Sequence, residues 1–190
     1  MKKTILTIAF ATTLITSCTD RNCTINGNIT GLDGEGWIYV EDAWGDFKVI
    51  DSTRYNNGVF TLEMDKVIFE TSVTISYSPD GGEDGNEVRR FLLEPGTILI
   101  EGDLKADRFS GVKGTAMNEL FNSCRHETRE FYRNLPRDVA KLKADSLTKE
   151  IFTKDITPAF RLYFVNRKMM DYPSALLLDE MDKLPQAYLD

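Results

Sequence analysis

The sequence lacks the residue patterns on which most catalytic and metal sites depend. Its 190 residues include one histidine, His126, and no Gly-x-Ser-x-Gly motif that would support a Ser-His-Asp site. Cys124 stands two positions before His126, and side chains two positions apart on a helix do not face each other. No further ligand has a spacing suited to zinc. We therefore expect no catalytic residue and no metal site, with His126 on a solvated helix face.

Positive charge is also scarce. Lysine and arginine total 23 against 30 acidic residues, so the net charge is −7, and loss of Lys2 and Lys3 with a leader would make it 21 − 30 = −9. The sequence has no basic stripe, which disfavours binding to nucleic acid or, by charge alone, to anionic lipid. The remaining composition, 42% hydrophobic and 28% charged, is ordinary for a globular domain. It excludes a disordered chain, a collagen-like repeat and a polytopic membrane protein.

The N-terminal residues follow the plan of a bacterial export signal. Lys2 and Lys3 precede an apolar stretch over 5–15 that is too short to span a bilayer comfortably. The segment Ile15-Thr16-Ser17-Cys18 resembles the lipobox of bacterial lipoproteins, in which the cysteine receives diacylglycerol and the new N-terminus is acylated. We expect a signal peptide at 1–17, lipidation of Cys18 and a short tether at 18–22. The alternative is an ordinary signal peptide with Cys18 destined for a disulfide.

Residues 23–114 are predicted to form a β domain. Short β-type runs alternate with turn residues, and Asn56-Asn57-Gly58 and Pro95-Gly96 are tight-turn signals. Trp37 and Tyr39 share one strand face and are expected in the core. The expected strands fall near 23–29, 37–41, 47–52, 59–63, 69–77, 88–94 and 97–101. This pattern favours an antiparallel β-sandwich or a partly open barrel.

Residues 115–190 are predicted to form a helical segment, which makes the fold class α+β. Apolar residues recur at steps of three and four from Met117 to Leu135, including Cys124. Thr115 is the expected N-cap and Pro136 interrupts the run. A second helical stretch covers 138–169, where Pro158 should split it, and a third covers 175–183.

Four segments in this order resemble a known family. They are Asp51-Ser52 with Asn57-Gly58-Val59-Phe60, then Phe91-Leu-Leu-Glu-Pro-Gly96, then Gly111-Val-Lys-Gly114 leading into Asn118, and last Asn166 with Tyr172-Pro-Ser174. The set resembles the uncharacterised (DUF) N-terminal domain of envelope thiol-disulfide oxidoreductases of the AhpC/TSA, TlpA-like type. The resemblance implies a lipoprotein whose partner is a thioredoxin-like domain or protein, with a homodimer as a further expectation. The family's redox motif is Cys-x-x-Cys, which this sequence lacks, so the activity does not carry over.

Cys23 and Cys124 remain after Cys18 is assigned to lipid. In an oxidising compartment they would form a redox pair, a structural disulfide, or no bond at all. We favour a buried Cys124 and an unpaired Cys23, because sequence does not show whether the two Cα atoms come within bridging range.

Two loops are candidates for ligand contact. Trp44 stands beside Gly45 among carboxylates and is the better candidate for an exposed contact with a glycan or peptide. The acidic loop at 80–87 has Asp80, Asp84 and Gly85 at the first, fifth and sixth places of a calcium loop. The twelfth place is Phe91 rather than glutamate, so a solvated hairpin tip is favoured over a calcium site.

The sequence therefore predicts a lipid-anchored accessory or interaction domain of the bacterial cell envelope, facing the periplasm or the exterior. We expect no enzymatic activity and no cofactor. The alternatives are a stand-alone envelope protein that binds a glycan, a peptide or calcium, and a minimal redox protein that uses Cys23 and Cys124.

Overall fold

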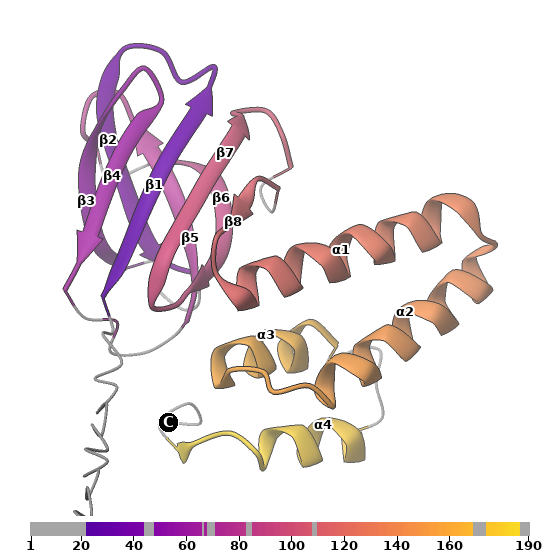
Figure 1. Ribbon diagram of the computed structural model, residues 1–190. Coiled ribbons are helices and arrows are strands. Elements are labelled where there is room, and N and C mark those ends of the chain that lie inside the picture. The colour runs from indigo at the N-terminus through magenta and orange to yellow at the C-terminus, as the bar shows by residue number, and fades with distance from the viewer. Residues whose placement is uncertain are drawn as a thin grey trace, which may run out of the picture.

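The computed structural model describes residues 22–43, 48–65, 67, 71–82, 85–107, 110–168 and 174–186, although side chains are not described at 166–168 and 174–176. Strands occupy the first part of the described chain and helices the second (Figure 1). The last strand ends at Lys113 and the first helix begins at Ala116.

All seven predicted strands are present, with bounds that differ by a few residues from the expected ones. A short eighth strand, β8, was not predicted. The strands are β1 (Cys23–Thr30), β2 (Glu35–Asp42), β3 (Val49–Asn56), β4 (Val59–Met64), β5 (Thr71–Ser78), β6 (Asn86–Leu93), β7 (Gly96–Asp103) and β8 (Val112–Lys113).

The strands form one mixed sheet that curls into a nearly closed barrel (Figure 1). The order is β6-β5-β2-β3-β4-β1-β7-β8, with β6 and β8 at the two ends. The predicted α+β class with a partly open barrel is confirmed. The described strand pairs are antiparallel as expected except β1 with β7, which run parallel with Cys23 opposite Gly96. An alternating apolar pattern is the same for a parallel or an antiparallel neighbour, so it does not reveal this pairing.

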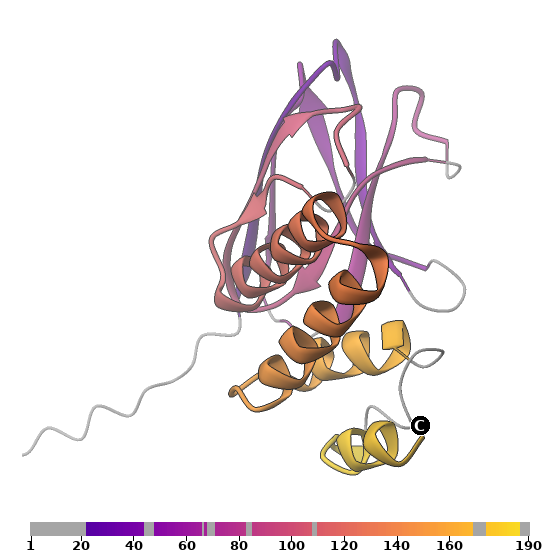
Figure 2. The same ribbon diagram turned by 90° about the vertical axis from the view of Figure 1, so that its right-hand side faces the viewer.

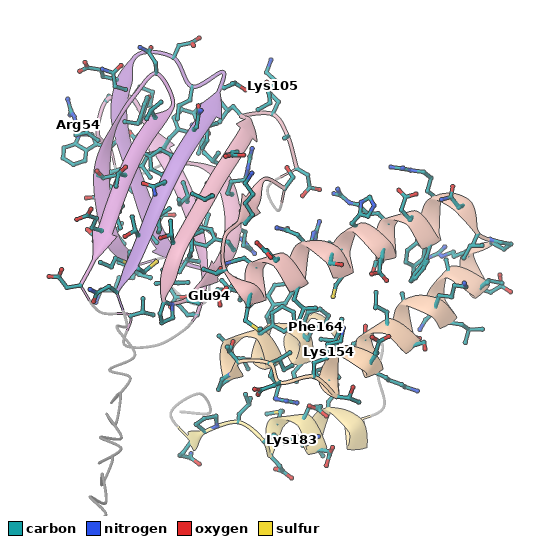
Figure 3. All side chains as sticks on the ribbon, viewed as in Figure 1. Arg54, Glu94, Lys105, Lys154, Phe164 and Lys183 are labelled. Atoms are coloured by element: carbon teal, nitrogen blue, oxygen red, sulfur yellow. The ribbon has the colours of Figure 1, made fainter. Side chains whose placement is uncertain are left out.

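Inward-facing side chains of every long strand fill the barrel, and Ile25, Ile38, Ile75 and Ile98 are completely buried. The expectation that Trp37 and Tyr39 lie in this core was wrong. Ile38 and Val40 hold the inward positions of β2, so the two aromatic rings lie on the outer face of the sheet. There the rings stack on each other, and the guanidinium of Arg54 lies 5.0 Å from the centroid of the Trp37 ring. Figure 3 shows the labelled Arg54 on the outside of the barrel.

The helices are α1 (Ala116–Asn134), α2 (Arg137–Phe152), α3 (Pro158–Lys168) and α4 (Ser174–Met181). Pro158 splits the second predicted stretch as expected, because it begins α3 rather than lying within a helix. In the described residues, no helix combines the length and the apolar character needed to cross a membrane. Figures 1 and 2 show α1 and α2 as a hairpin at one side of the barrel, with α3 and α4 next to it.

Candidate functional site

A buried polar junction fixes the helices to the barrel. Asn118 on α1 is fully buried, and its side-chain amide pairs with β6 as a neighbouring strand would. Its Nδ2 donates to the carbonyl of Leu92 at 2.8 Å, and its Oδ1 accepts from the Leu92 amide at 3.0 Å. At this point a helix side chain thus hydrogen-bonds the backbone N–H and C=O groups of β6, an end strand of the sheet.

Glu94 and Thr115 complete this junction. The carboxylate of Glu94 accepts from the Asn118 backbone at 3.0 Å and from its Nδ2 at 3.1 Å, so Glu94 lies beside the first turn of α1 (Figure 3). Thr115 occupies the predicted N-cap position but makes no side-chain bond to the helix backbone. Its hydroxyl instead accepts from Asn118 Nδ2 at 2.9 Å. The orientation of α1 on the barrel is therefore specified by several directed bonds.

The hairpin of α1 and α2 and the adjoining α3 line a partly open cavity of about 330 Å³. Its apolar wall consists of Phe121, Leu147, Ile151, Tyr163 and Phe164. The rings of Phe121 and Tyr163 meet edge to face with centroids 4.9 Å apart, which holds this wall in place. Figure 3 shows the labelled Phe164 in the space below α1. A volume just above 300 Å³ is at the lower end of the range for small-molecule pockets, which are mostly apolar with a few polar groups.

Two arginines supply the charge of this cavity. Arg125 and Arg129 lie one turn apart on α1 and both line it. Asp107, in the loop between β7 and β8, forms an ion pair with Arg125 at 3.4 Å and a second ion pair with Arg129. Arg129 is half-exposed, so its ion pair lies where the cavity meets solvent. Of these three described side chains, the two on α1 are positive and the one from the barrel loop is negative.

The polar groups deeper in the cavity are neutral. The hydroxyl of Thr148 donates to the Ala144 carbonyl of its own helix at 2.9 Å. Burial raises the pKa of the Cys124 thiol to about 11, with a smaller effect from Glu127 in the same direction and an opposing one from Lys154. Cys124 is therefore a protonated thiol at neutral pH, and a protonated thiol is a poor nucleophile.

Cys23 and Cys124 are both free and buried. Cys23 belongs to the barrel core, whereas Cys124 belongs to the separate cluster formed by the helices. Burial, with help from the charge of Glu94, raises the pKa of Cys23 to about 11 as well. The structure does not bring these two cysteines together as a pair, and neither environment favours a thiolate.

Some of the other predicted site residues lie outside the described part of the chain, and the rest are described by the structure. Cys18 and Trp44 lie outside the described residues, as do Glu83 and Asp84 of the acidic loop. Asp80 accepts from the Ser78 hydroxyl at 2.8 Å, which lowers the pKa of its carboxyl. No cluster of three or more histidine, cysteine or acidic side chains suited to a metal occurs in the described part of the chain. His126 is exposed on α1, as predicted.

The barrel matches the model of a known domain family. The family model described as a domain of unknown function (DUF4369) matches residues 23–121, more than half of the chain. The chain belongs to the DUF4369 family. No curated protein and no solved structure gives a significant match. The match confirms the resemblance at the level of an uncharacterised domain, and the link to thioredoxin-like proteins remains a proposal.

The DUF4369 match covers the barrel and the start of α1 up to Phe121. It therefore includes the junction at Asn118, whereas most residues that line the cavity lie beyond it. Sequence reasoning did not identify Arg125, Arg129 or Asp107 as site residues. The signal that could have found the two arginines was their spacing of four residues, next to the apolar face that contains Phe121 and Cys124.

Proposed function

We propose that this DUF4369 protein is a non-catalytic accessory domain of the bacterial cell envelope, anchored by lipid at Cys18 and acting by non-covalent binding. The observation that carries the proposal is the cavity between α1, α2 and α3, with its apolar wall and arginine rim. The directed bonds of Asn118 to Leu92 and Glu94 support it, because they hold the cavity in a fixed relation to the barrel. A thioredoxin-like domain or protein is the proposed partner.

The position of the first strand supports anchoring beside the helices. Cys23 at the start of β1 pairs with Gly96, and a Cβ on Gly96 would lie 3.4 Å from the methyl group of Thr115, just before α1. The start of β1 and the start of α1 thus lie at the same end of the barrel (Figure 1). The five residues 18–22 reach about 18 Å at most when extended. A lipid at Cys18 would therefore hold the helices near the membrane.

Cell fractionation tests the anchor. In the native host, we expect the wild-type protein in the membrane fraction and the Cys18→Ala variant in the soluble fraction or as an unprocessed precursor. Cys23→Ala is the matched control, because Cys23 lies in the barrel core and should not affect the anchor. Equal distribution of the wild type and Cys18→Ala would contradict lipid attachment at Cys18.

An insulin-reduction assay tests the non-catalytic part of the proposal. The raised pKa values of Cys23 and Cys124 disfavour thiol exchange at neutral pH, so we expect no turnover by the chain alone. Turnover that disappears in Cys124→Ala would contradict the proposal and favour a redox protein.

A further inference from the structure

Aromatic and aliphatic side chains of the helical cavity present a surface suited to an apolar ligand. Phe121 on α1, Leu147 and Ile151 on α2 and Tyr163 and Phe164 on α3 surround the same space. Burying an apolar group against such a wall releases water and is favourable at about 25 cal/mol per Å² of buried apolar surface. A volume of about 330 Å³ admits one small chain or ring system rather than a folded domain.

The charge at the rim indicates which charge the polar end of such a ligand would carry. Arg125 and Arg129 contribute two guanidinium groups, and Asp107 forms an ion pair with each of them. Each guanidinium has five N–H donors, and Arg129 pairs with Asp107 while half-exposed to solvent. A second carboxylate at this position would gain charge-assisted hydrogen bonds, whereas a cation would be repelled.

Charges of both signs lie near the inner part of the cavity. Thr148 is bonded within its own helix. Glu127 and Glu150 raise the pKa of the Cys124 thiol and Lys154 lowers it, so more than one sign of charge surrounds that thiol. Among the cavity-lining residues in the described part of the chain, the charged groups are the two arginines.

We propose that the cavity between α1, α2 and α3 binds a single-chain fatty carboxylate, with its chain against Phe121 and Phe164 and its carboxylate at Arg125 and Arg129. This inference deepens the proposed function, on which it rests, by naming the ligand class. A membrane close to the helices is a source of such amphiphiles. Cys124, which lines the cavity, becomes covered when the ligand binds.

Isothermal titration of the purified chain from Cys18 or Thr19 onward with octanoate, octanol and acetate tests the ligand class. We expect octanoate to bind most tightly, octanol to bind more weakly and acetate not to bind at all. Arg129→Gln should weaken octanoate binding about tenfold, a loss of about 1.4 kcal/mol, and weaken octanol binding much less, because octanol carries no charge to pair with the guanidinium. Arg133→Gln is the matched control, since Arg133 lies one turn further along α1, is exposed and does not line the cavity.

Two further measurements locate the bound ligand. Octanoate should slow the alkylation of Cys124 by iodoacetamide and leave Cys23, in the barrel core, unaffected. Leu147→Trp, which fills the cavity, should abolish binding of both octanoate and octanol, whereas Leu142→Trp on the exposed side of α2 should not. Circular dichroism and a melting curve for each variant exclude unfolding as the cause of a loss.

The outcomes separate the two proposals. Octanol binding as tightly as octanoate, or equal octanoate affinity for Arg129→Gln and wild type, would overturn the carboxylate assignment. Absence of binding by both octanoate and octanol would overturn the ligand class altogether. Neither result bears on the lipid anchor, which the distribution and processing of Cys18→Ala test separately.

Discussion

At the scale of single residues, Asn118 connects the two parts of the fold. Its amide satisfies both the N–H and the C=O of Leu92 in a buried position. No apolar side chain of similar size would satisfy these groups, and water does not reach them freely. This asparagine therefore contributes more to stability than its small side chain alone suggests.

We expect Asn118→Ala to lower the free energy of unfolding by about 3 kcal/mol, because two buried backbone groups lose their partner. Asn134→Ala is the matched control. Asn134 is exposed at the end of α1 and bonds only to Glu130 among the contacts described, so its loss should cost less than about 0.5 kcal/mol. Urea denaturation of both variants measures the difference, and equal stability of the two would contradict the role of Asn118.

The two buried thiols predict how stability falls at high pH. Burial raises the pKa of Cys23 and Cys124 from 9.0 to about 11, so the unfolded chain loses these protons first. Their contribution is complete below about pH 9 and is lost as the pH rises toward about 11. We expect the decrease in unfolding free energy between about pH 8 and about pH 10.5 to be smaller in Cys23→Ala than in wild type.

Urea titrations at the two pH values measure this effect. Burial also raises the pKa of Tyr55, which contributes to the same decrease in both proteins and therefore cancels in the comparison. An identical decrease in Cys23→Ala and wild type would show that the Cys23 thiol is not protected in the folded state.

At the scale of elements, the turn between β3 and β4 determines the register of the hairpin. Asn57 has a φ of 46° and Gly58 has a φ of +76°, values that suit the tight turn expected from Asn-Gly. A Cβ on Gly58 would lie 2.0 Å from the Ile29 carbonyl oxygen, so the turn also packs closely on β1. The turn signal in the sequence was therefore reliable, because it depends on local backbone geometry.

We expect Gly58→Ala to destabilise the protein by at least about 2 kcal/mol, since both the backbone conformation and the contact with Ile29 become unfavourable. Gly34→Ala is the matched control. Gly34 has nearly the same φ of +74°, but a Cβ added there would meet no atom within 4 Å, so this variant should lose only about 1 kcal/mol. Thermal unfolding of both variants gives the comparison, and an equal loss would contradict close packing at Ile29.

Local sequence patterns did not predict several other features of these elements. The parallel pairing of β1 with β7 joins strands far apart in the sequence, and β8 has two residues and no periodicity to detect. The expected face of Trp37 and Tyr39 was wrong because their strand has apolar residues at both parities, and Ile38 and Val40 occupy the interior. Sequence patterns do not reveal the cavity, because residues from three separate helices line it together.

At the scale of the whole molecule, the barrel, the junction and the cavity form one continuous arrangement. Asp107 of the β7–β8 loop meets Arg125 and Arg129 on α1, so the barrel contributes to the rim of the helical cavity as well as to its support. The start of β1 lies at the end of the barrel where α1 begins. A lipid anchor just before β1 would therefore serve a binding site in the helices.

The mass of the intact native protein extracted from its membrane tests this account most directly. We predict a chain that begins at Cys18 and carries the added mass of acyl chains, which hydroxylamine and lipase treatment would remove in part. A chain that retains residues 1–17, or one that begins near residue 18 without acyl groups, would contradict the lipid anchor. The helices would then have no established place beside a membrane, and the proposed source of their ligand would be lost.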